Sequence, residues 1–173
     1  MMMDKFKLTF LSVLLVCFAL TTAISQDKQK PSPPATAEGK IAGIDVKIDY
    51  HQPSARERKI MDGLVPYGKV WRTGANDATT IEISEDIKVE GKALAKGKYS
   101  LFTIPGEKEW VIIFNKTAKQ WGAYDYDEAK DVLRVKVKPG KTSDFVETFN
   151  ISVVDGGVEM KWENTNVKFA LSK

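Results

Sequence analysis

The run VWRTGANDATT at residues 70–80 is the strongest candidate for a functional site in this chain. Within six residues it carries a guanidinium, a hydroxyl, an amide and a carboxylate, from Arg72, Thr73, Asn76 and Asp77. A guanidinium offers a planar fork of donors that fits a carboxylate, phosphate or sulfate group. Gly74 permits a positive φ, so we expect a tight loop after a strand. The run therefore predicts a cup for a small polar or anionic ligand, with Trp71 or Tyr67 as its apolar wall.

A structural interpretation of the same run stays open. In it, Arg72 is paired with a nearby carboxylate such as Asp77, and Asn76 caps the loop. Internal ion pairs produce clusters of this kind as readily as binding sites do. The structure must therefore show whether the guanidinium already has a partner within the protein.

A second candidate is the loop WGAYDYD at 121–127, where aromatic residues stand among small and acidic ones. Exposed rings stack on the apolar faces of sugars, while neighbouring carboxylates bond the hydroxyls, so Trp121 and Tyr124 indicate a glycan-binding face. The alternative is that this loop folds over an open end of a sheet. We expect Trp110 and Trp162 to lie in the core instead, because burying an aromatic side chain is strongly favourable.

His51, the only histidine, stands at the expected end of a strand and suits a general base. A hydrolase-like enzyme would use it with Asp77 or Asp125, and with Arg72 as the oxyanion partner. No nucleophile at a telling spacing accompanies it, so we favour a non-catalytic binding module. A purely structural protein of the cell envelope is a further alternative.

Composition argues against several other functions. Without residues 1–25, which are predicted below to be removed, the chain has 24 basic residues (26 minus two) and 22 acidic ones (23 minus one). Its formal charge is therefore about +2. A charge this small indicates neither nucleic acid nor an anionic membrane as a partner. One histidine and the single Cys17 make a zinc site improbable. The acidic residues at 125–131 lack the glycine and ligand spacing of a calcium loop, and no phosphate-binding glycine loop is present. We expect no metal and no cofactor.

Short alternating segments from residue 41 onward predict an all-β fold. Ile44, Val46, Ile48 and Tyr50 alternate with charged residues, and similar runs follow at 79–83, 87–89, 92–94, 99–104, 110–114, 133–137, 145–154, 158–162 and 167–171. About nine or ten short strands at this spacing indicate an antiparallel β-sandwich, jelly-roll-like or barrel-like. Helix signals are limited to two short turns, at 54–63 and 127–131.

The N-terminal residues predict export. Lys5 and Lys7 precede an apolar run over residues 8–20, and Ala23-Ile24-Ser25 has the small residues of a signal-peptidase site. We expect residues 1–25 to be a signal peptide, 26–40 a flexible Pro-rich spacer, and 41–173 one domain in the periplasm or outside the cell. A lipoprotein anchored through Cys17 fits less well because Val16 precedes it, and a retained anchor helix is the other alternative. After cleavage no membrane insertion is expected.

Four segments resemble the bacterial domain of unknown function 2911 (DUF2911) family: GLVPYGKVWRTGANDATT (63–80), GKYSLFTIPGEKEWVIIFNK (97–116), QWGAYDYD (120–127) and DVLRVKVKP (131–139). The resemblance covers nearly all of 41–172 and implies an exported, mostly β, single domain without an assigned activity. Members usually carry Ser-Arg-Pro after the first strand and Lys-Gly-Arg further on. Here Gln52 replaces the first arginine, whereas Arg58 keeps the second and joins the candidate ligand-binding residues.

The signal-peptide pattern predicts that the mature chain begins at Gln26, because the small residues before it match the specificity of signal peptidase. N-terminal sequencing of the protein recovered outside the cytoplasm checks this. An intact N-terminus, or a lipid on Cys17, would contradict it.

Overall fold

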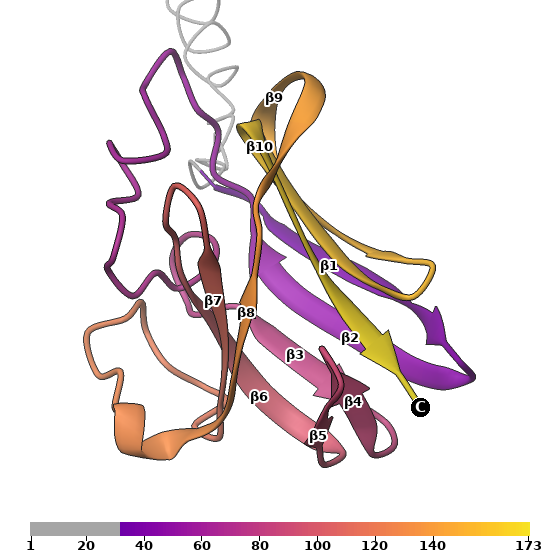
Figure 1. The fold of residues 1–173 in the computed structure, drawn as a ribbon. Coiled ribbons are helices and arrows are strands. Elements are labelled where there is room, and N and C mark those ends of the chain that lie inside the picture. Colours follow the sequence, from indigo (N-terminus) through magenta and orange to yellow (C-terminus); the bar gives the residue numbers. More distant parts are fainter. Residues whose placement is uncertain (1–31) are drawn as a thin grey trace, which may run out of the picture.

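The computed structural model describes residues 32–173 as two packed antiparallel sheets (Figure 1). The six-stranded sheet has the order β1-β2-β3-β6-β7-β8 and the four-stranded sheet the order β5-β4-β10-β9. The strands are β1 (Pro34–Ile41), β2 (Ile44–His51), β3 (Thr80–Ile83), β4 (Ile87–Val89), β5 (Lys92–Leu94), β6 (Gly97–Ile104), β7 (Trp110–Asn115), β8 (Asp131–Val137), β9 (Gly140–Val154) and β10 (Gly157–Ser172). The all-β antiparallel prediction is confirmed, and the sheets do not close into a barrel.

Alternating burial explains why these residues form strands. In β2 the side chains of Ile44, Val46, Ile48 and Tyr50 are buried, whereas the residues between them are exposed or half-buried. Five consecutive residues of β6, Tyr99–Thr103, are all buried. A strand covered on both faces loses the alternation. The outer face of the six-stranded sheet is therefore covered at β6 and open at β2.

The predicted start of the domain at residue 41 is wrong, because β1 begins at Pro34 and pairs with β2 along its whole length. Residues 34–40 are therefore not a spacer. The strand was hard to recognise because Ala35 and Ala37 are its inward residues and alanine favours strands weakly. Pro34 is tolerated because it is the first residue of an edge strand. The predicted signal peptide and residues 26–31 lie outside the described residues.

The predicted helical turn at 54–63 is also wrong. Arg56 and Glu57 have φ values of 51° and 60°, which a right-handed helix does not allow, and Ser54 forms a bridge to Thr148 of β9 instead. The turn predicted at 127–131 is confirmed as the 3₁₀ helix η1 (Glu128–Lys130). Its N-cap, Asp127, accepts a hydrogen bond from Ala129 N at 2.9 Å.

The last two predicted strands form one strand, β10. Register shifts against β9 occur between Lys161 and Glu163 and between Glu163 and Thr165, and Glu163 has a φ of 55°. Such bulges bend a strand without ending it. The polar stretch at 163–166 therefore marks a bend in β10 and not a turn between two strands.

Aromatic rings join the two sheets at the centre of the core. Trp71 lies 5.1 Å from Phe149, 5.9 Å from Trp162 and 6.3 Å from Trp110, measured between ring centroids. Trp110 and Trp162 are each 2% exposed, as predicted. Aromatic contacts of this kind add to the stabilisation from burial alone.

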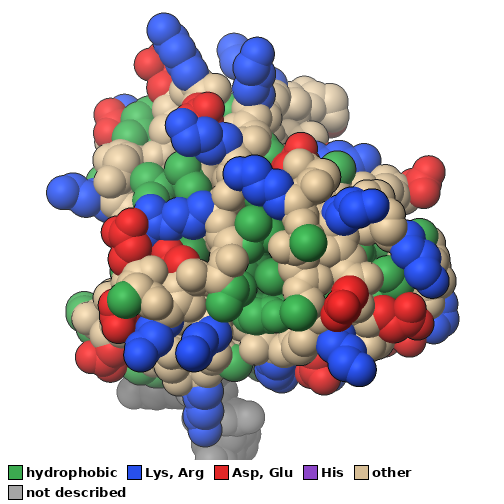
Figure 2. Space-filling model, turned by 60° about the horizontal axis from the view of Figure 1, so that its bottom comes forward, with side chains coloured by type: hydrophobic (Ala, Val, Ile, Leu, Met, Phe, Trp, Pro, Cys, Tyr) green, Lys and Arg blue, Asp and Glu red, His purple; other side chains and the backbone are tan. Residues whose placement is uncertain are grey.

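The surface carries mixed charge. On the end of the sandwich at the bottom of Figure 1, basic and acidic side chains are interspersed, and hydrophobic side chains gather in the middle (Figure 2). This face therefore has no extended field of one sign. In residues 32–173, no helix is long and apolar enough to cross a membrane.

We expect Phe149→Ala to lower the free energy of unfolding by about 3–5 kcal/mol, because it leaves a cavity among the central rings. Phe145→Ala is the matched control, since Phe145 lies on the same strand but is 54% exposed. Its effect should stay within about 0.5 kcal/mol. Equal losses of stability in urea-unfolding experiments would contradict the assignment of this cluster as the core.

Candidate functional site

A row of polar residues crosses the outer face of the six-stranded sheet, with one residue on each strand. In the order of the strands, the row is Thr36, Asp49, Thr80, Ser100, Asn115 and Asp131, each paired in register with the next. These residues point outward because their chain neighbours, such as Ile48 and Ile81, point into the core. We call this set the polar row. One part of it is open to solvent, and a loop covers the rest.

The open part of the polar row forms a cavity of about 490 Å³, which we call the outer-face cavity. Its wall includes Thr36, Asp49, His51, Asp77, Thr80 and Lys119. These residues come from the neighbouring strands β1, β2 and β3 and from two loops. The wall therefore consists largely of a preformed sheet. The volume lies within the range of about 300–1,000 Å³ usual for small-molecule sites.

Only some charged groups of the outer-face cavity already have partners. Asp49 Oδ1 accepts a hydrogen bond from Thr36 Oγ1 at 2.8 Å, and Asp49 Oδ2 lies 3.7 Å from Lys98 Nζ. Within residues 32–173, the side chains of His51, Asp77 and Lys119 have no hydrogen bond or ion pair. The cavity therefore offers a carboxylate, an imidazole and an ammonium group to a ligand.

The side chain of Gln120 separates the open part of the polar row from the covered part. Its Nε2 donates to Ser100 Oγ at 3.1 Å, to Asn115 Oδ1 at 3.2 Å and to Thr117 O at 2.7 Å. Gln120 is 8% exposed and also lines the outer-face cavity. Because these buried hydrogen bonds hold it in place, it forms a fixed end wall.

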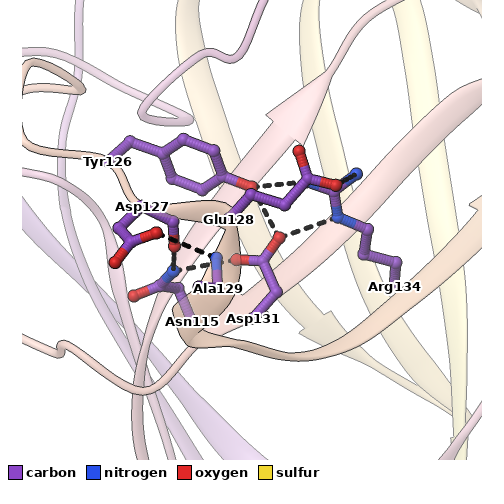
Figure 3. Close-up of polar contacts among 7 residues, drawn as sticks. All are labelled: Asn115, Tyr126, Asp127, Glu128, Ala129, Asp131 and Arg134. Carbon is purple, nitrogen blue, oxygen red and sulfur yellow. Dashed lines mark hydrogen bonds and ion pairs between the residues drawn. The ribbon is translucent and has the colours of Figure 1, made fainter.

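A cluster of polar contacts fastens the far end of the same loop to β8 (Figure 3). The hydroxyl of Tyr126 donates to Asp131 Oδ2 at 2.5 Å, and Arg134 donates to Tyr126 Oη at 2.6 Å and to Asp131 Oδ2 at 2.7 Å. Asn115 Nδ2 donates to Asp131 Oδ1 at 2.8 Å, and Glu128 pairs with Arg134 at 3.0 Å. Burial and the hydrogen bond to Asp131 raise the pKa of Tyr126 to about 12, although the hydrogen bond from Arg134 opposes this.

Most of the run at 70–80 forms a structural corner. Trp71 pairs with Thr103 through two backbone hydrogen bonds of 2.7 and 2.9 Å, and its ring lies in the core instead of at a ligand cup. Thr73 is fully buried, and its Oγ1 donates to Thr103 Oγ1 at 3.1 Å. Gly74 has a φ of 157°, and a Cβ there would lie 3.0 Å from the carbonyl oxygen of His51. Trp71 and Thr73 are therefore not accessible to a ligand.

Arg72 differs from the rest of the corner. The residue is half-buried, and no ion pair with Asp77 is formed. Its Nε is buried without a hydrogen-bond partner in the part of the chain that the structure describes. A buried unpaired donor costs about 1–3 kcal/mol, so such groups are rare in folded proteins. Arg72 does not line the outer-face cavity.

The two predicted site segments lie side by side. Asp77 forms an antiparallel bridge with Trp121, Gly122 N donates to Asn76 O at 3.1 Å, and Ala78 N donates to Gln120 O at 3.0 Å. Trp121 is 59% exposed and Tyr124 84% exposed. The Asn76 side chain is occupied, because its Nδ2 donates to Ser32 O at 3.3 Å.

Two other predicted residues lie apart from this arrangement. Tyr67 is half-buried beside a second cavity of about 370 Å³ with Trp110 and Glu163. Arg58 donates from Nε to Ala55 O at 2.9 Å and from Nη2 to Ser54 O at 2.8 Å, so it holds its own loop together. The structure thus brings His51, Asp77 and Trp121 together and leaves Tyr67 and Arg58 elsewhere.

Sequence reasoning missed Thr36, Thr80, Lys98, Lys119 and Gln120 as wall residues. Thr80 is an outward position of a predicted strand, so alternation indicated its face but not its neighbours. Lys98 directly precedes the predicted strand at 99–104 and belongs to β6 in the structure. Thr36 lies on β1, within the segment that the sequence predicts as a spacer. Gln120 and Lys119 lie on a loop whose path no local pattern determines.

A family model described as "Protein of unknown function (DUF2911)" matches residues 32–171. The chain belongs to this family. The match extends over both sheets and both loops of the candidate site, so the resemblance seen in the sequence is confirmed. No curated protein and no solved structure matches the chain. Within residues 32–173, no group of three His, Cys, Asp or Glu side chains is placed to hold a metal ion.

The raised pKa of Tyr126 predicts a loss of stability in alkali. The neutral phenol is favoured in the folded state, so its contribution is complete below pH 10 and is lost as the pH rises through about 12. We expect Tyr126→Phe to lack this part of the pH dependence and to lose about 1 kcal/mol at pH 8 with the hydroxyl. Urea midpoints of both proteins from pH 8 to pH 12 measure the difference. Parallel curves would contradict the role of this hydroxyl.

Proposed function

We propose that this DUF2911 domain is a non-catalytic binding module that takes a small polar ligand in the outer-face cavity. One observation carries the proposal: His51, Asp77 and Lys119 face a preformed cavity of about 490 Å³ and have no partners among the described residues. A binding site typically combines a concave, largely fixed wall with a few unsatisfied polar groups. The rest of the described polar groups around it are mostly bonded to one another.

A saccharide is the ligand class that these groups favour. A sugar hydroxyl both donates and accepts hydrogen bonds. A carboxylate can accept from it, an ammonium group can donate to it, and an imidazole can do either. Trp121, next to Asp77 through their backbone bridge, adds an exposed ring on which a sugar face can stack. The loop that carries this ring is held at both ends, by Gln120 and by Tyr126, so little order has to be gained on binding.

The hydrolase alternative has weaker support. His51 and Asp77 do line the same cavity, but Arg72 is not among the lining residues. No described hydroxyl donates a hydrogen bond to His51, so no pair of nucleophile and base is assembled there. We also propose that the domain acts after export, as its N-terminal residues predict.

Isothermal titration calorimetry with oligomers of glucose, N-acetylglucosamine and galacturonate tests the proposal. We expect at least one series to bind saturably. Trp121→Ala and Asp77→Asn should each weaken binding about tenfold, equivalent to about 1.4 kcal/mol. Thr80→Phe should abolish it by filling the cavity, whereas Thr80→Val, of nearly unchanged volume, should retain it.

Phe145→Ala is the control for Trp121→Ala, because Phe145 is similarly exposed but lies on β9 of the other sheet. Its affinity should equal that of the unaltered protein. The proposal fails if none of the three series binds at millimolar concentration, or if Thr80→Phe binds as well as Thr80→Val.

A further inference from the structure

Arg72 is an exception among the four arginines of the chain, all of which the structure describes. Arg58 bonds two backbone carbonyls, and Arg134 bonds Asp131, Glu128 and Tyr126. Arg56 is not without a partner either. The guanidinium of Arg72 alone makes no hydrogen bond or ion pair with any residue in 32–173. A buried polar or charged group is ordinarily paired, and the Nε of Arg72 is buried, so its isolation requires an explanation.

The backbone around Arg72 is firmly fixed. Its carbonyl accepts a hydrogen bond from Thr79 N at 3.1 Å, and Trp71 before it is bonded to Thr103 in both directions. Thr73 after it is fully buried and has a φ of 56°, a conformation that non-glycine residues rarely adopt. The side chain therefore starts from a rigid corner, and a ligand would find it already positioned.

The isolation of Arg72 contrasts with the pairing of the side-chain donors next to it. The indole of Trp71 donates to Gly74 O at 3.1 Å, Thr79 Oγ1 donates to Thr73 O at 2.7 Å, and Asn76 is bonded to Ser32. Every one of these donors is satisfied internally. The neighbouring donors are thus paired, whereas the half-buried guanidinium of Arg72 and the exposed carboxylate of Asp77 are left without partners in residues 32–173, which has the character of a site and not of a packing defect.

The two ends of the guanidinium are in different surroundings. Nε is shut off from solvent and unpaired, whereas Nη1 and Nη2 are not among the buried unpaired atoms and have no protein partner within 32–173. The terminal amino groups are therefore the donors that a ligand can reach. Together they can bond two oxygens of one planar or tetrahedral oxyanion.

We propose that Arg72 binds an oxyanion group of a ligand, a carboxylate, phosphate or sulfate, end-on through Nη1 and Nη2. This site is separate from the outer-face cavity, which Arg72 does not line, so the proposal does not depend on the proposed function. The bound oxyanion supplies the counter-charge that the described residues do not provide. Carboxylate, phosphate and sulfate groups all offer two acceptor oxygens on one anionic centre.

NMR of the full chain tests this proposal directly. The probes are acetate, phosphate and sulfate, each titrated against sodium chloride at constant ionic strength, and the readout is the side-chain Nε–Hε signal of each arginine. We expect a saturable shift of the Arg72 signal with at least one anion and none for the Arg58 signal. The anion that binds most tightly distinguishes a carboxylate ligand from a phosphate or sulfate ligand.

Arg72→Met keeps the apolar stem and removes the guanidinium. We expect it to weaken binding of that anion, followed through neighbouring backbone amides, at least about tenfold. Its melting temperature without anions should equal or exceed that of the unaltered protein, because no internal hydrogen bond or ion pair is lost and an unpaired donor is removed. Arg58→Met, which loses two bonds to carbonyls, should melt at a lower temperature and bind the anion unchanged.

The proposal is overturned if no anion shifts the Arg72 signal saturably, or if Arg72→Met binds the anion as well as the unaltered protein does. A large fall in the melting temperature of Arg72→Met would also overturn it, since that result means the guanidinium has a structural role. Loss of saccharide binding in the cavity variants leaves these outcomes unaffected, so the two proposals can fail separately.

Discussion

The burial of Trp71 is the constraint on which the rest of the site depends. Its ring contacts Trp110 from one sheet and Phe149 and Trp162 from the other, while its backbone pairs with Thr103 on β6. Because neighbouring residues of an extended chain point to opposite faces, burying this ring turns the Arg72 side chain away from the ring cluster. The chain then turns at Gly74, where a side chain would meet the backbone of His51. One buried ring thus places both the arginine and the loop that borders the cavity.

The same corner holds residues that stabilise the turn beside residues whose side chains make no internal bond. Thr73 and Thr79 satisfy buried backbone and hydroxyl groups, so these positions stabilise the turn. Asp77 and Arg72 contribute no internal bond through their side chains in the described residues. A fold gains little stability from such groups, and natural proteins tend to keep them where a ligand uses them. The structural interpretation of this run therefore holds for Trp71, Thr73 and Thr79, whereas the binding proposals rest on Arg72 and Asp77.

The outer-face cavity exists because the loop after β7 covers only part of the sheet. Gln120 bonds Ser100 and Asn115 in the middle of the polar row, and beyond it Thr80 and Asp49 are left open. Polar residues on a sheet face ordinarily need no explanation where water covers them. Here a loop that is anchored by buried hydrogen bonds covers half of that face. The edge of this loop forms a wall beside the open half, and the open half is therefore a cavity.

The sequence alone was sufficient for the all-β class and for most strands, because alternation and turn residues are local properties of the chain. It was also sufficient to single out residues 70–80 and the loop containing Trp121. It missed β1, whose small inward residues give a weak signal, and it divided β10 at a bulge. Only the tertiary structure decided which side chains meet: Asp77 with Trp121, Gln120 with Ser100, and Arg72 with no partner among the described residues. Pairing across strands depends on register and loop path, which are set by the packing of the whole core and not by neighbours in the chain.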